Sequence, residues 1–315
     1  MISDMSLLNT AQPFVEKHVD NKNIEDEVED SVESNAEGIV EECIGESIDE
    51  GVKKNTMNSS TKTNIVYELP FNEKIRTFVR LESLFEEIEF KLQGVTVWDS
   101  RSTMSSFMAL LAVFSRPEIK SDLMKEMDRM NNVLSKYSLV DGVNTGRLQD
   151  VQEELCQTAK KLKSMEGQIG QNLKLNELIM SIRQRNSLPG GALEIDVPNY
   201  AYWLSQDIEI RNADIRNWLK EFDLIKSAVT LVLRLIRESV VENDVIATKG
   251  VYQHVLDAGT VTQIIRVELP KGSPCFPEIS GGRHRFTVRF LKPMGAERPV
   301  QIEQDVSFKI ICCTL

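Results

Sequence analysis

Hydrophobic residues recur along this chain with two different spacings. Between Asn72 and about residue 246 they return every three or four positions, which is the spacing of one face of an α-helix. From about residue 247 onward they return every second position, as expected for one face of a β-strand. The pattern therefore predicts an α+β fold, with a mainly helical domain at 72–246 and a β domain made of 63–71 and 247–315.

The helical part divides into amphipathic segments with recognisable ends. Asn72 is a residue type that often caps helices, and it precedes the apolar positions Ile75, Phe78, Val79, Leu81, Phe85, Ile88 and Leu92. Further helices are expected through "SFMALLAVFS", which breaks before Pro117, then up to Tyr137, from about Thr145 to Met165, in "LNELIMSIRQR", in "NYAYWLSQ" and in "NADIRNWLKEFDLIKSAVTLVLRLIRES". The last of these is apolar on most sides, which predicts a central core helix.

Several short runs have the alternation of β-strands. In the C-terminal part they are "GTVTQIIRVEL", "RFTVRF" and "PVQIEQDVSFKIICC", separated by the turn signals "KGSP" and "PMGAERP". They predict an antiparallel meander or sandwich with one buried face. Two distant runs, "IVYEL" near the start and "ALEIDV" at 192–197, are expected to join this sheet, because isolated strands cannot satisfy their backbone groups.

The stretch "GGRHRFTVRF" at 281–290 carries the most distinctive pattern. As a strand it would place His284, Phe286, Val288 and Phe290 on one face and Arg283, Arg285, Thr287 and Arg289 on the other. Arginines at alternate strand positions present planar forks that suit carboxylates or phosphates. This face is therefore predicted to bind an anionic ligand, and nucleic acid, phospholipid or an acidic peptide would each fit it.

The net charge of −11 is unevenly distributed over the 315 residues. Residues 1–62 hold 15 acidic side chains against 5 lysines, whereas residues 63–315 hold 33 acidic and 32 basic ones. The composition of 1–62 predicts a disordered acidic extension, which a start at Met57 would almost remove. The nearly neutral remainder, without an exposed aromatic platform on the basic strand, argues against the alternative of a nucleic-acid-binding module.

Candidate catalytic and metal-binding groups are sparse in the sequence. The three histidines have no ligand spacing, and the five cysteines form no CxxC pair, which favours reduced thiols and a cytoplasmic location. "SLPGGA" lacks the lysine and hydroxyl residue of a phosphate loop. We therefore expect a binding protein rather than an enzyme, with no catalytic residue, metal or cofactor and no membrane insertion.

Five segments together resemble one known family in the same order along the chain. They are "ELPFNEKIRTFVRLE" (68–82), "KEMDR" (125–129), "IRQRNSLPGG" (182–191), "FPEISGGRHRFTVRF" (276–290) and "FKIICC" (308–313). The likeness is to the ZapD (YacF) family of Z-ring-associated bacterial division proteins, and it leaves residues 1–62 outside.

This resemblance implies a specific partner and site. The family consists of cytoplasmic homodimers that bind FtsZ, the tubulin-like division GTPase, in particular its C-terminal tail, and bundle its protofilaments at midcell during septation. The family's FtsZ-binding basic residues correspond here to Arg116, Arg285 and Arg289. Arg283 and Arg80 are added as candidates because of their charge.

Overall fold

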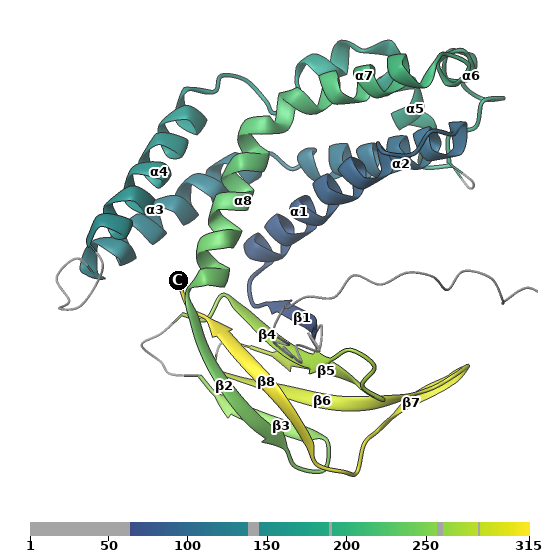
Figure 1. Ribbon diagram of the computed structural model, residues 1–315. Helices are drawn as coiled ribbons and strands as arrows, with labels where there is room; N and C mark the ends of the chain where they lie inside the picture. Colours follow the sequence, from purple (N-terminus) through teal and green to yellow (C-terminus); the bar gives the residue numbers. More distant parts are fainter. Residues whose placement is uncertain (1–63, 138–144, 189–190, 257–260, 283) are drawn as a thin grey trace, which may run out of the picture. The chain divides into compact units, whose positions relative to one another are not determined.

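A computed structural model of the chain describes residues 64–137, 145–188, 191–256, 261–282 and 284–315. They belong to one compact unit, Ser60–Leu315. The predicted acidic extension at 1–62 and the candidate Arg283 lie outside the described residues. Within the compact unit, Figure 1 shows the helices gathered on one side and the strands on the other.

Most helices begin and end close to where the apolar spacing predicts them, but the single helix expected at 212–239 is divided in two by a 3-10 turn at Lys220–Phe222. Asn72 caps the first helix, because its side chain accepts a hydrogen bond from the backbone nitrogen of Ile75 at 2.7 Å. Thr96 and Asp99 form a reciprocal capping box at the start of the second. The helices are α1 (Glu73–Lys91), α2 (Val97–Phe114), α3 (Ile119–Tyr137), α4 (Thr145–Ser164), α5 (Glu177–Arg185), α6 (Pro198–Leu204), α7 (Ile208–Leu219) and α8 (Asp223–Glu238), with 3-10 turns η1 (Asn172–Leu175) and η2 (Lys220–Phe222).

The described strands form two four-stranded antiparallel sheets. The first has the order β1-β4-β8-β2, and the second has the order β3-β6-β5 with β7 paired to β6. The strands are β1 (Asn64–Pro70), β2 (Val240–Ala247), β3 (Val251–Val255), β4 (Ile264–Pro270), β5 (Phe276–Gly281), β6 (Arg285–Met294), β7 (Glu297–Gln301) and β8 (Val306–Cys313). The run "IVYEL" joins the sheet from afar as predicted, because β1 pairs with β4 in the register Tyr67 to Val267.

The strand expected at 192–197 is wrong, since this segment is a turn. The backbone nitrogens of Asp196 and Val197 both donate to the carbonyl oxygen of Leu193, and Pro198 then begins α6. These local hydrogen bonds replace the ladder that a sheet would have supplied. Ile195 is 86% exposed, so its place in an alternating pattern does not reflect burial.

The first sheet is covered on both faces, not on the single face expected. Ile264 and Cys313 belong to the core beneath the helices, to which α8 contributes most of its length. Ile265 of β4 and Phe308 of β8 point the other way, into a second core between the two sheets. The helices, the first sheet and the second sheet therefore form three successive layers.

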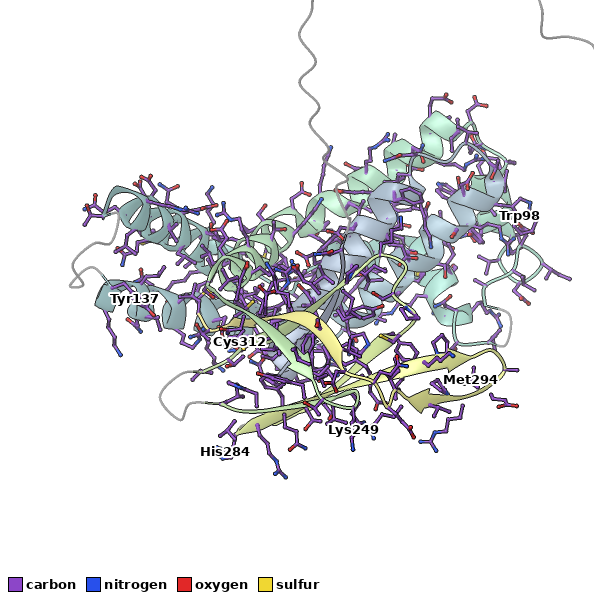
Figure 2. All side chains as sticks on the ribbon, turned by 60° about the horizontal axis from the view of Figure 1, so that its bottom comes forward. Trp98, Tyr137, Lys249, His284, Met294 and Cys312 are labelled. Atoms are coloured by element: carbon purple, nitrogen blue, oxygen red, sulfur yellow. The ribbon has the colours of Figure 1, made fainter. Side chains whose placement is uncertain are left out.

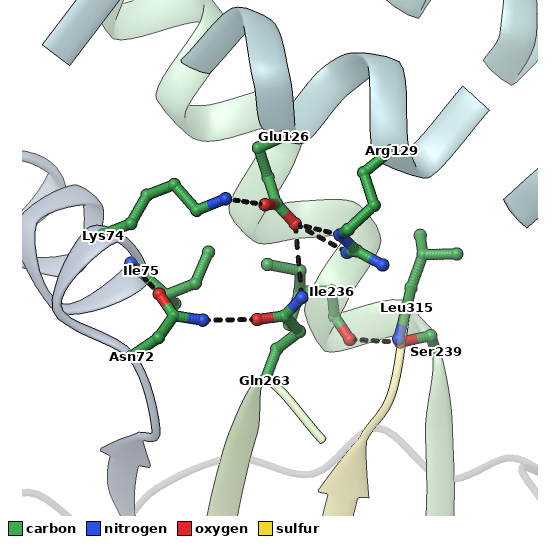
Figure 3. A network of polar contacts seen from close by, with 9 residues as sticks. All are labelled: Asn72, Lys74, Ile75, Glu126, Arg129, Ile236, Ser239, Gln263 and Leu315. Atoms are coloured by element: carbon green, nitrogen blue, oxygen red, sulfur yellow. Dashed lines mark hydrogen bonds and ion pairs between the residues drawn. The ribbon is translucent and has the colours of Figure 1, made fainter. Parts of the chain in front are cut away.

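A buried carboxylate connects the helices to the first sheet (Figure 3). Glu126 of α3 is fully buried and is paired with Lys74 of α1 and with Arg129, whose Nε lies 2.8 Å away. Gln263 donates to Glu126 and accepts from the side chain of Asn72 at 2.6 Å. The residue that caps α1 is thereby held through Gln263 to the buried charge on α3.

A second polar junction joins α8 to β1 and α1. Arg237 donates to both carboxylate oxygens of Glu68 and to both of Glu82, at 2.7–3.0 Å. Burial by itself would lower the pKa of Arg237, but the hydrogen bonds to Glu82 and Glu68 outweigh it and raise that pKa. The guanidinium therefore stays charged, and its two bidentate pairs fix the end of α8 over the sheet.

We expect the thiols of β8 to resist alkylation in the folded protein. Burial raises the pKa of Cys313 to about 11 and also raises the pKa of Cys312. At pH 8 both are therefore thiols rather than reactive thiolates, whereas Cys156 is exposed on α4. Iodoacetamide labelling followed by peptide mass spectrometry should modify Cys156 first, and should modify Cys312 and Cys313 after unfolding. Equal labelling rates in the native protein would contradict this burial.

Candidate functional site

The basic strand is β6, and its two faces differ as the alternation predicts. Phe286, Val288 and Phe290 are buried in the core between the sheets, whereas Arg285 and Arg289 are exposed on the outer face. The two arginines are four residues apart on one side of the strand, or about 13 Å at roughly 3.3 Å per residue. The exposed outer face is therefore confirmed for these two positions.

The start of this strand differs from the expectation. The strand begins at Arg285, so His284 precedes it and is exposed rather than placed on the apolar face. The carbonyl oxygen of His284 accepts the backbone nitrogen of Leu256, which fixes the chain as it enters the strand. In Figure 2, His284 and Met294 mark the two ends of this strand.

The neighbours of the two β6 arginines leave their charge available. Arg285 lies opposite Val255 of β3 and has no ion-pair partner among the described residues. Arg289 lies between Val251 and Glu278, and it forms an ion pair with Glu278. Both members of that pair are about half exposed, and such surface pairs contribute only about 0.2–1 kcal/mol. An incoming carboxylate would thus meet one free arginine and one weakly held arginine.

The other two described candidates, Arg80 and Arg116, meet at a single carboxylate. Glu73, in the first turn of α1, lies 3.6 Å from Arg80 and 4.0 Å from Arg116. Arg76 also approaches it at 3.6 Å. The side chains of Arg80 and Arg116 are more than half exposed. One negative charge therefore faces three positive ones, which leaves an excess of positive charge for an anionic partner.

Phe71 connects the arginines around Glu73 to the arginines of β6. It lies two residues before Glu73, and its ring centroid is 6.4 Å from that of Phe286, the residue next to Arg285 on β6. Among the described residues no hydrogen bond or ion pair joins Arg80 or Arg116 to the β6 arginines directly. We name the two sets together the arginine surface: Arg76, Arg80, Arg116, Arg285 and Arg289.

The sequence reading missed Glu73 and Arg76. A signal was present, because Glu73, Arg76 and Arg80 have the i, i+3, i+7 spacing of one helix face. Arg116 reaches Glu73 because α2 packs on α1. The two residues are about forty positions apart, so local spacing could not predict this contact. The described residues contain no group of three or more His, Cys, Asp or Glu side chains placed to hold a metal ion.

Comparison with known proteins identifies the family. The family model for ZapD, described as a cell division protein, matches residues 79–289. This chain belongs to the ZapD family. It is 38% identical over 254 residues to the cell division protein ZapD of Methylococcus capsulatus, a match that covers 81% of this chain and 100% of that relative. It is 35% identical over 251 residues to ZapD of Aromatoleum aromaticum, covering 80% of this chain and 98% of that relative.

A third relative, ZapD of Nitrosomonas eutropha, is 34% identical over 253 residues, with 80% of this chain and 100% of that relative covered. Membership of the ZapD family supports a role in cell division. The span matched by the ZapD model includes Arg80, Arg116, Arg285 and Arg289. In the part of the chain that the structure describes, no helix is both long enough and apolar enough to cross a membrane.

Proposed function

We propose that this chain binds FtsZ and, as a cytoplasmic homodimer, crosslinks its protofilaments at the division site. The observation that carries the proposal is the arginine surface, which presents exposed guanidiniums on β6 and around Glu73. An acidic, extended segment such as the C-terminal tail of FtsZ suits this surface, because guanidiniums form charge-assisted hydrogen bonds to carboxylates. The chain acts in this account by binding and not by catalysis.

Bundling requires at least two docking surfaces on one particle. A twofold homodimer would supply two copies of the arginine surface, and each copy could hold a different filament. Binding the second filament then gains from the high effective concentration that the first attachment creates. Light scattering of the purified protein should therefore give the mass of a dimer, and calorimetric titration with FtsZ should show saturable binding.

A nucleic-acid partner is the second candidate, and the charge distribution speaks against it. Residues 63–315 are nearly neutral overall, and the rings of Phe286 and Phe290 point into the core instead of offering a stacking platform. Retention of DNA or RNA with a steep salt dependence, together with no binding of FtsZ, would favour this alternative over the proposed function.

The acidic residues of 1–62 should weaken the docking of an acidic partner. Their 15 carboxylates carry the charge sign that the arginine surface attracts, and we expect them to compete with FtsZ for it if they are translated. A variant that starts at Met57 should therefore bind FtsZ more tightly at low salt. At physiological salt the difference should shrink, because charges are screened beyond about 8 Å. Equal affinities of the full-length and shortened proteins at low salt would rule out the competition.

A further inference from the structure

The two halves of the arginine surface are carried by different layers of the fold. Arg80 and Arg116 surround Glu73 on the helical side, whereas Arg285 and Arg289 lie on the second sheet. One ligand can engage both halves only if their separation is fixed, because charge-assisted hydrogen bonds depend steeply on distance. The residues that set this separation therefore contribute to the binding site even if they carry no charge.

Phe71 is placed to set that separation. It follows β1 and precedes the Asn72 cap of α1, and its backbone nitrogen donates to the carbonyl oxygen of Gln263 at 3.0 Å. Its ring packs against Phe286 with an interplanar angle of 46°. Phe286 points inward from β6 while its neighbour Arg285 points outward. Through these two contacts Phe71 joins the start of α1 to the inner face of β6.

Gly281 provides the space in which the ring of Phe71 lies. It ends β5 opposite Phe286, and a Cβ atom at this position would come within 2.6 Å of Cε1 of Phe71 and 2.8 Å of Cβ of Phe286. Distances this short between carbon atoms require one of the partners to move. The next residue differs sharply, because a Cβ on Gly282 would meet nothing within 4 Å. The two glycines of "GGRHR" thus have different roles.

We propose that the contact between Phe71 and Gly281 is a positioning device that holds the Glu73 cluster and the β6 arginines at the separation that one acidic ligand spans. Phe71 and Gly281 are positioning residues, since neither presents charge to the partner. The inference rests on the proposed function, because its consequence is measured as binding of FtsZ. It adds to that site two residues that carry no charge.

The test compares Gly281→Ala with its matched control Gly282→Ala. Gly281→Ala should weaken FtsZ binding by about tenfold or more, at a temperature where circular dichroism shows it folded, because a site loosened by about 1 Å loses its complementarity. Gly282→Ala should bind within about twofold of the parent. Phe71→Leu removes the ring but keeps an apolar side chain, and it should weaken FtsZ binding as Gly281→Ala does. It replaces Gly281→Ala in the test if that variant does not fold.

A second readout separates positioning from general destabilisation. Arg116→Ala should weaken binding by about tenfold in the parent and by less than about twofold in the Gly281→Ala background, because the displaced cluster no longer reaches the ligand held by β6. The inference would be overturned if Arg116→Ala weakened binding by the same factor in both backgrounds, or if Gly281→Ala bound FtsZ as tightly as the parent. Either result would leave the proposed function standing. A parent protein that does not bind FtsZ would overturn both.

Discussion

Charge reversal at both outer arginines of β6, Arg285→Glu with Arg289→Glu, should reduce FtsZ affinity by more than about a hundredfold while leaving the fold intact. Losing one desolvated charged contact typically costs about 2 to 5 kcal/mol, and each 1.4 kcal/mol is a factor of ten. The fold should survive because both side chains point outward, away from the core between the sheets. Calorimetric titration of the purified, dimeric variant with FtsZ measures the effect, and Arg116→Glu should act in the same direction.

Two control variants make this result specific. Lys160→Glu with Lys163→Glu changes the net charge by the same amount on the exposed side of α4 and should leave affinity within about twofold. Phe286→Ala changes the buried face of β6 and should lower the free energy of unfolding by about 3 to 5 kcal/mol. If the double arginine variant is folded and binds FtsZ as tightly as the parent, the outer face of β6 is only a solvated surface and FtsZ binds elsewhere.

Removing the buried carboxylate of α3, by Glu126→Ala, should lower the free energy of unfolding by about 3 to 5 kcal/mol. The substitution leaves Lys74 and Arg129 without their shared partner, and Gln263 loses one of its two hydrogen bonds in this network. The side chains of the two cations are about 30% exposed, so they regain some hydration. We therefore expect the loss of unfolding free energy to lie near the lower end of this range, at about 3 kcal/mol. Urea unfolding monitored by tryptophan fluorescence measures this change in free energy.

Asp128→Ala is the matched control for this substitution. Asp128 is an exposed residue on the same helix, and its side chain has no ion pair or hydrogen bond among the described residues. Its replacement should change the free energy of unfolding by less than about 0.5 kcal/mol. Similar values for Glu126→Ala and Asp128→Ala would show that the network in Figure 3 does not stabilise the fold.

Local features of the sequence predicted the helices and the basic strand well. Asn72 is a cap, Pro117 lies just beyond the end of α2, and the alternation around Phe286 gives the correct inward and outward faces. These features depend on backbone geometry and on burial over a few residues, so they are visible in the spacing of residue types.

Features that depend on contacts between distant residues could not be predicted in the same way. The alternation of Leu193, Ile195 and Val197 resembles a strand, but the segment closes into a hydrogen-bonded turn before Pro198. The buried position of Glu126 depends on partners from α1 and from the entry to β4. Such contacts override local preference, because tertiary packing decides which alternating run reaches a sheet.

Low-speed sedimentation of FtsZ polymers tests the central claim most directly. Single protofilaments remain in the supernatant at low speed, whereas crosslinked bundles enter the pellet. With GTP present, the purified chain should move FtsZ into the pellet together with itself, and the Arg285→Glu, Arg289→Glu variant should not. If a folded, dimeric parent protein leaves FtsZ in the supernatant at equimolar concentration, the claim that this chain crosslinks FtsZ through its arginine surface is contradicted.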